Sequence, residues 1–365
     1  MTKLQQLHAE LGQSPWLDNL RRDWLVDGTL RSWIDRGVRG VTSNPTIFQK
    51  AMSQGTAYDE QFTELLQAGL SVPEAYWAMV VKDVEDTLEL FQPVHDESGG
   101  EDGFVSLELA PEQARDTAAS IEAARNFHTS IAAPNLYVKI PATAEGIPAV
   151  QAMVAEGRNI NITLIFSLER YAEVMEAYLS GMEAFEGDLS GVRSVASFFV
   201  SRVDTEVDRR LEALGTEEAL ALRGKAAVAQ AKLAYRDFRH VFTGRRWDAL
   251  VARGANLQRP LWASTSTKNP AYSPTLYIDT LIGPDTVNTM PEATLDAFEG
   301  SGTLARTVDE GVAEAEAIWQ ALSEVGVDLD DVGRTLEDEG VAAFSKSYDE
   351  LIGVLEGKAA ELRSR

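Results

Sequence analysis

A single lysine lies in an otherwise apolar, strand-like run of the sequence. The stretch NLYVKIPATAEGIP, residues 135–148, places Lys139 between two branched apolar residues and ends its apolar part at Pro141. Lysine is rarely buried without a partner. One interpretation is an edge-strand lysine whose ammonium lies in water. The other is a desolvated amine that acts as a nucleophile on a carbonyl substrate.

Polar residues recur near the carboxyl ends of the other strand-like runs. In a barrel of parallel strands, these ends point into the mouth that carries the active site. A lone polar residue in a strand is usually a hydrogen-bonded structural group, whereas a set at matching positions of successive runs indicates a shared site. The set consists of Asp18, Thr42, Ser43, Asn44, Glu108, Lys139, Asn161, Thr163, Ser197, Arg202 and Lys268.

The residue types in this set narrow the chemistry. The chain has no cysteine, and without H-x-H or H-E-x-x-H spacing a metal hydrolase is disfavoured. No G-x-S-x-G nucleophile elbow occurs either. The histidines, all outside the strand-like runs, are His8, His95, His128 and His240.

An amine with carboxylates and no metal suits Schiff-base chemistry on a ketone or aldehyde. Such chemistry needs the neutral amine, and burial in an apolar barrel disfavours the ammonium. A carboxylate directly beside the amine would have the opposite effect. We therefore expect Asp18 and Glu108 to stand apart from Lys139 and to reach it through water or substrate.

The strand-like runs alternate with longer helical segments. This alternation is typical of parallel strands joined by right-handed crossovers, and eight such units can close into a barrel. An open doubly wound sheet is the alternative, disfavoured because neither G-x-G-x-x-G nor G-x-x-x-x-G-K-S/T occurs. We expect an α/β fold with a single (β/α)8 TIM barrel domain over residues 1–365 and additional N- and C-terminal helices. The runs span residues 14–20, 38–44, 104–110, 136–142, 159–166, 192–199, 259–265 and 285–290.

Apolar spacing and capping residues predict several of the helices. Apolar residues three and four apart predict a helix over 72–92, and a second over 111–131 opens on its proline. Ser273 and Pro274 are typical of an N-cap and a first helical residue, and Gly283 of the stop of that short helix.

A long C-terminal helix and an acidic loop complete the predicted elements. The helix carries an apolar stripe that we interpret as a packing face, and the turn-rich stretch HDESGGEDG, residues 95–103, is expected to be a solvated insertion. The stripe consists of Val341, Phe344, Tyr348, Leu351 and Leu355.

Charge and hydropathy restrict the partners. The formal net charge of −24 disfavours nucleic acid and anionic membranes, while a small phosphorylated substrate would need a local cluster of cations. No apolar run approaches the roughly 20 residues that span a bilayer. The N-terminal stretch lacks the apolar segment of a secretion signal, so a cytoplasmic location is expected.

Several of these stretches also resemble a known family. The stretches GVTSNPTIF (40–48), LYVKIPATAEGIPAV (136–150), NITLIFS (161–167) and SFFVSRVD (197–204) resemble those of the transaldolases. WASTSTKNP and DTVNTMP are similar to the longer bacterial form. The resemblance implies a barrel of the class I aldolase type. It further implies transfer of a dihydroxyacetone unit from sedoheptulose 7-phosphate to glyceraldehyde 3-phosphate, giving erythrose 4-phosphate and fructose 6-phosphate, without cofactor or metal.

The resemblance also assigns catalytic roles by motif. Lys139 would form the Schiff base, and Asp18 would take the proton of the C4 hydroxyl as the C3–C4 bond breaks. Glu108, with Thr163 and a held water, would shuttle protons during carbinolamine formation and dehydration. Phe198 and Phe199 are expected to form an apolar wall around the enamine intermediate.

Substrate-binding roles follow in the same way. Asn44, Asn161 and Ser197 would hold the hydroxyls of the three-carbon unit, and Arg202 matches the phosphate-binding arginine. Many shorter members of the family have a second phosphate-binding arginine after the seventh strand, where this chain has Lys268. A lysine there offers only a point charge.

Two further outcomes stay open. The related fructose-6-phosphate aldolases carry tyrosine where Phe199 falls, so phenylalanine favours transfer, and a lyase releasing free dihydroxyacetone is the alternative. A non-catalytic barrel is disfavoured, because Asp18, Glu108, Lys139 and Arg202 are all present. The resemblance is also compatible with a homodimer.

Overall fold

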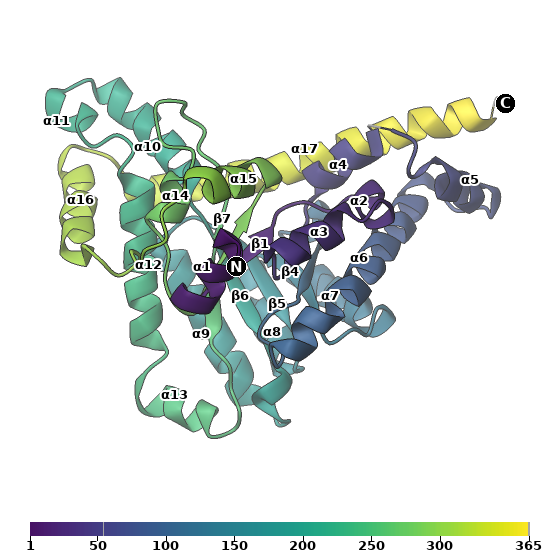
Figure 1. The fold of residues 1–365 in the computed structure, drawn as a ribbon, viewed down its shortest axis with the longest axis horizontal. Coiled ribbons are helices and arrows are strands. Elements are labelled where there is room, and N and C mark those ends of the chain that lie inside the picture. Colours follow the sequence, from purple (N-terminus) through teal and green to yellow (C-terminus); the bar gives the residue numbers. More distant parts are fainter. Residues whose placement is uncertain (54, 364–365) are drawn as a thin grey trace.

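The computed structural model describes residues 1–53 and 55–363. Eight parallel strands close into a barrel in the order β1-β2-β3-β4-β5-β6-β7-β8, with helices around it (Figure 1). Every predicted strand run forms a strand, and the (β/α)8 fold is confirmed. The strands are β1 (Gln13–Leu17), β2 (Val41–Thr42), β3 (Val105–Glu108), β4 (Leu136–Pro141), β5 (Ile160–Ile165), β6 (Ser194–Phe199), β7 (Gln258–Ala263) and β8 (Thr286–Met290).

Helices connect the strands. As expected, the chain has additional helices at its two termini, α1 before the first strand and α17 as the last element. Within the described ranges, no helix is both long and apolar enough to cross a lipid bilayer. In chain order, the helices are α1 (Lys3–Leu11), α2 (Arg22–Val26), α3 (Thr29–Arg36), α4 (Pro45–Ser53), α5 (Asp59–Gln67), α6 (Val72–Glu97), the 3-10 turn η1 (Pro111–Gln113), α7 (Thr117–Ser130), α8 (Gly146–Ala155), α9 (Leu168–Ala184), the 3-10 turn η2 (Leu189–Gly191), α10 (Ser201–Leu214), α11 (Glu217–Leu220), α12 (Ala226–Val241), α13 (Gly244–Val251), α14 (Leu276–Asp279), α15 (Glu292–Ser301), α16 (Val312–Glu324) and α17 (Leu329–Arg363).

The helix predicted over 111–131 is wrong in its first turn. Pro111 opens only the short turn η1, and the α-helix begins six residues later, at Thr117. The reason is the cap at Asp116, whose side chain accepts a hydrogen bond from the backbone N–H of Ala119 at 2.9 Å. An aspartate side chain at the N-cap accepts a hydrogen bond from an otherwise unpaired N–H group of the first turn. A proline side chain has no acceptor and cannot do this.

The short helix predicted from Ser273 is also wrong in its bounds. Its single turn begins at Leu276 and ends at Asp279, before Gly283. The Ser273 hydroxyl accepts a hydrogen bond from the N–H of Thr275 at 3.3 Å, so it stabilises the turn that leads into the helix and does not cap it.

The stretch 95–103 is only in part the solvated loop that its composition suggested, since residues 98–101 form a partly exposed turn while the two ends of the stretch do not. Helix α6 continues to Glu97, and Asp102 is only 1% exposed. Arg39 and Arg259 pair with its carboxylate at 2.7 and 3.1 Å. Burial alone would raise the pKa of Asp102, but Arg259 and Arg39 hold it below its ordinary value. This carboxylate is therefore part of the structure at the amino-terminal end of the barrel.

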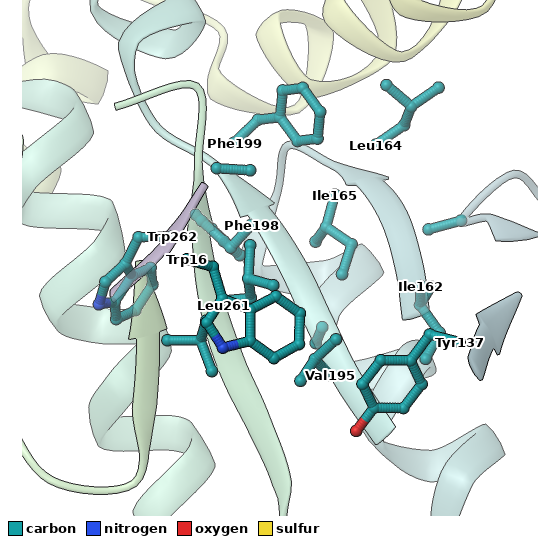
Figure 2. Packing of buried hydrophobic residues seen from close by; sticks show 14 of the residues in the cluster. Trp16, Tyr137, Ile162, Leu164, Ile165, Val195, Phe198, Phe199, Leu261 and Trp262 are labelled. Atoms are coloured by element: carbon teal, nitrogen blue, oxygen red, sulfur yellow. The ribbon is translucent and has the colours of Figure 1, made fainter. Parts of the chain in front are cut away.

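The strand register sets which inward-facing side chains become neighbours. Glu108 of β3 pairs with Lys139 of β4, and Lys139 pairs with Asn161 of β5. One pleat further along, Pro141 pairs with Thr163. Outward-facing residues such as Phe198 and Trp262 lie in the apolar core shown in Figure 2.

Candidate active site

A cavity of about 540 Å³ opens at the carboxyl ends of the strands. Two of the ten predicted site residues, Glu108 and Asn161, do not line it and contact lining residues instead. The eight that line it are Asp18, Asn44, Lys139, Thr163, Ser197, Phe199, Arg202 and Lys268. The mouth of the barrel thus brings the predicted set together from strands β1 to β7 and the segments that follow them.

Lys139 is buried at this mouth with its amine in contact with polar atoms. Its exposed fraction is 5%, and Nζ donates hydrogen bonds to the carbonyl oxygen of Ser43 at 3.1 Å and to Oε2 of Glu108 at 3.3 Å. The edge-strand interpretation is wrong, because β4 pairs on both sides in a closed barrel.

Glu108 contacts the amine directly, so the expectation that it would stand apart is wrong. The register places Glu108 and Lys139 opposite each other on neighbouring strands, which leaves no room for a separating water. Burial raises the pKa of Glu108 to about 7, although Lys139 opposes the shift. A carboxyl with this pKa can both accept and donate a proton near neutral pH.

Two buried oxygens beside this pair have no hydrogen-bond partner among the described residues. They are Oε1 of Glu108 and Oγ1 of Thr163. Buried polar groups are normally hydrogen-bonded, so atoms of this kind are suited to bind a water or a substrate hydroxyl.

Asp18 lies apart from the amine, as expected, and forms no hydrogen bond or ion pair with Lys139 among the described residues. It accepts a hydrogen bond at 2.7 Å from Thr42, whose hydroxyl is also 2.6 Å from that of Thr289. Burial raises the pKa of Asp18, and Lys139 opposes the rise. Sequence reasoning missed Thr289, although it lies in the weak run 285–290.

The neutral polar residues form a hydrogen-bonded row across three strands. Asn161 donates from Nδ2 to the hydroxyl of Ser106 at 3.0 Å and accepts at Oδ1 from Ser197 at 2.7 Å. Sequence reasoning missed Ser106, although its spacing of two from Glu108 places both on one face of a strand. Asn44 lines the cavity and also accepts from the N–H of Ile47 at 3.1 Å, in the first turn of α4.

Three cations line the cavity without a carboxylate partner. Arg202, Lys268 and Lys50 form no ion pair with any described residue, although Lys268 donates to the hydroxyl of Ser266 at 2.8 Å. Burial, then Arg202, then Lys50 lower the pKa of Lys268, with Asp18 opposing. Burial also lowers the pKa of Arg202. Sequence reasoning missed Lys50, because it lies on helix α4 and not in a strand. In a chain of net charge −24, unpaired cations at one place are suited to bind an anion.

Only one of the two phenylalanines expected in the apolar wall lines the cavity. Phe199 does, and the guanidinium of Arg202 lies 5.2 Å from the centre of its ring. Phe198 faces the other way, where its ring packs against those of Tyr171 and Trp262; Figure 2 shows Phe198 on the side of Trp262. The expectation for Phe198 is wrong because successive strand residues point to opposite faces.

Comparison with known proteins agrees with this geometry. The family model described as Transaldolase/Fructose-6-phosphate aldolase matches residues 15–355. The chain is 50% identical over 354 residues to a transaldolase of Thermobifida fusca, covering 96% of each chain. It is 49% identical over 357 residues to transaldolase 1 of Streptomyces coelicolor, covering 96% of this chain and 93% of the relative. It is also 49% identical over 352 residues to a transaldolase of Mycolicibacterium smegmatis, covering 95% of each. The chain belongs to the transaldolase/fructose-6-phosphate aldolase family.

Proposed function

We propose that the protein transfers a dihydroxyacetone unit from sedoheptulose 7-phosphate to glyceraldehyde 3-phosphate through a Schiff base on Lys139, as a transaldolase does. The observation that carries the proposal is the buried amine of Lys139, in contact with Glu108 at the mouth of the barrel. The relatives at about 50% identity are themselves named transaldolases.

The first step needs a neutral amine. A proton passed from Lys139 to Glu108 leaves an uncharged amine beside an uncharged carboxyl, and the pKa of about 7 at Glu108 makes the exchange possible near neutral pH. The amine adds to the C2 carbonyl of the ketose, and Glu108 returns its proton as the hydroxyl of the carbinolamine leaves as water. A water held by Glu108 Oε1 and Thr163 Oγ1 would relay these protons.

The second step breaks the C3–C4 bond. Asp18 takes the proton of the C4 hydroxyl, the aldehyde departs, and the electron pair of the broken bond moves to the C2 iminium to give an enamine. Thr42 donates a hydrogen bond to Asp18 and so orients its carboxylate. The reverse sequence, with a second aldehyde, forms the new bond.

The remaining residues hold the substrate. Arg202, Lys268 and Lys50 would bind the phosphate, because these cations of the cavity form no ion pair with any residue that the structure describes. Asn161 and Ser197 would bind hydroxyls of the three-carbon unit, with the Asn161 amide fixed by Ser106. Asn44 would also bind a hydroxyl of this unit, while its Oδ1 accepts the hydrogen bond from Ile47 at the start of α4.

Borohydride trapping tests the proposal. Incubation with fructose 6-phosphate and sodium borohydride should reduce the imine to a stable secondary amine, located by peptide mass spectrometry on Lys139. Lys268 and Lys50 line the same cavity, so the unmodified state of these two is an internal control. Lys139→Met should give no adduct. An adduct on another lysine, or none in the unchanged protein, contradicts the proposal.

The fate of the enamine separates transfer from the alternative lyase reaction. Release of free dihydroxyacetone without an acceptor, at a rate equal to transfer, would identify a fructose-6-phosphate aldolase. Three expectations from the sequence stay predictions: a cytoplasmic location, a homodimer and a single domain over residues 1–365. Light scattering in solution measures the second.

A further inference from the structure

Helix α17 crosses the mouth of the barrel and is fixed on both sides of it. At one side, a Cβ at Gly340 would lie 3.1 Å from Cδ2 of Leu164, at the end of β5. At the other, the hydroxyls of Thr46 on α4 and Ser347 on α17 are 2.8 Å apart. Figure 1 shows the yellow helix α17 running alongside α4. The segment between these two attachments is therefore held over the cavity.

Phe344 lies between these attachments. It is 7% exposed and is the residue of α17, among those the structure describes, that lines the active-site cavity. Its place in an apolar stripe suggested a packing face alone, so this position was not expected from the sequence. Gly340, one turn earlier, lies against Phe166, whose ring packs at 5.0 Å on that of Phe199. An apolar layer thus runs from β6 to α17 around the polar site.

The chemistry of the enamine gives this layer a function. After the first aldehyde leaves, the enamine can add to a second aldehyde, or its C3 can take a proton to give the iminium of dihydroxyacetone. Water then adds to C2, and the carbinolamine breaks its C–N bond to release dihydroxyacetone and the free amine of Lys139. The second route consumes one water, so excluding water favours transfer.

We propose that Phe344 is the residue of α17 that keeps water from the enamine and so sets the ratio of group transfer to release of free dihydroxyacetone. The proposal rests on the proposed function. Phe199 supplies the wall on the barrel side and Phe344 the wall on the helix side. Removal of the Phe344 ring opens the cavity toward solvent without removing any polar group of the site.

The test compares two rates from fructose 6-phosphate. Transfer is measured as sedoheptulose 7-phosphate formed with erythrose 4-phosphate, and release as dihydroxyacetone formed without an acceptor. Phe344→Ala should raise the ratio of release to transfer roughly tenfold, corresponding to about 1.4 kcal/mol between the two barriers. Phe344→Leu should raise it by a smaller factor, since a leucine fills part of the space.

A glycine on the same helix supplies the control. A Cβ at Gly353 would have nothing within 4 Å, so Gly353→Ala should leave the ratio unchanged. A Phe344→Ala ratio within about twofold of the unchanged protein, with borohydride trapping on Lys139 intact, overturns this proposal and leaves the proposed function standing. Loss of trapping in the unchanged protein overturns both. If Phe344→Ala does not fold, the Phe344→Leu ratio decides by the same criterion.

Discussion

Asp102 at the amino-terminal end of the barrel and Glu108 at its carboxyl end are both buried carboxylates beside cations, and they differ in how well they are satisfied. Asp102 pairs with Arg39 and Arg259 and accepts hydrogen bonds from Ser14 and Trp16. Its pKa lies below the ordinary value.

Among the described residues, Lys139 is the one hydrogen-bond and ion-pair partner of Glu108, and the second carboxyl oxygen of Glu108 has none. Burial raises the pKa of Glu108 to about 7. The same contrast holds for cations. Arg39 and Arg259 are paired with Asp102 at one end, while Arg202, Lys50 and Lys268 at the other end have no ion-pair partner within the described part of the chain. A carboxylate whose hydrogen bonds and ion pairs are all formed stays charged in the folded protein. A carboxylate or cation that lacks such partners can instead exchange a proton or bind an anion.

The largest expected effect is at the mouth. Lys139→Met should reduce transfer activity roughly 10⁴-fold or more, because loss of a covalent nucleophile removes the whole pathway. At or below pH 7 the free energy of unfolding should change little, because burial already raises the pKa of Glu108 to about 7, so this carboxyl takes a proton and becomes neutral once its partner is gone. Initial-rate assays and urea denaturation measure the two quantities. Substantial remaining activity would contradict the role of Lys139.

Removal of a buried charge at the amino-terminal end of the barrel should lower stability and leave the activity unchanged. Asp102→Asn leaves the partly buried Arg39 and Arg259 without their carboxylate and should lower the free energy of unfolding by about 3–5 kcal/mol. The kcat of the folded fraction should stay the same, because Asp102 lies at the opposite end of the barrel. A loss of kcat without loss of stability would show that the two ends are not independent in this way.

The pH dependence of the two carboxyls should have opposite sign. Asp102 contributes stability above its ordinary pKa of 3.8, and this is lost as pH falls through its lower folded pKa. Between the ordinary value of 4.5 and about 7, Glu108 keeps a proton in the folded state that the unfolded chain releases, so its contribution to stability falls as pH rises. Urea titrations of Asp102→Asn and Glu108→Gln between pH 3 and 8 should each lose one of these slopes.

Glu108 should also control the rate. Below about pH 7 it is protonated and cannot accept the proton of Lys139, so kcat/KM for fructose 6-phosphate should fall about tenfold per pH unit. Glu108→Gln should lower kcat/KM roughly 10²-fold and abolish this acidic limb. A variant that keeps the limb would assign it to another group, such as Asp18, whose pKa burial also raises.

The sequence predicted the barrel because alternation of strands and helices and polar strand ends are local patterns. Of the ten site residues that it predicted, eight line the cavity. The Glu108–Lys139 contact could not be predicted, because it depends on strand register, which no local pattern specifies. Asp102 was misread for a related reason, since its arginine partners are distant in the chain.

Helix-borne residues of the site were the other omission. Lys50 on α4 and Phe344 on α17 reach the cavity because their helices pack across the mouth. An amphipathic stripe predicts that one face of a helix packs against the protein. It does not show whether that face lies on the core or on an active site. Phe198 and Phe199 show the limit at the finest scale, since adjacent residues of one strand divide between core and cavity.

The smallest expected effect concerns the unpaired cations. Lys50→Met should raise the KM for fructose 6-phosphate roughly tenfold with little change in kcat, because a phosphate contact remote from the breaking bond stabilises ground and transition states alike. The matched control is Lys346→Met, which removes the same charge from an exposed position on α17 outside the cavity. The increase at Lys50 should shrink in high salt, since screening weakens what a point charge adds, whereas the control should show neither effect. Equal KM changes in the two variants would mean that net charge, and not an arrangement of cations at the mouth, attracts the phosphate.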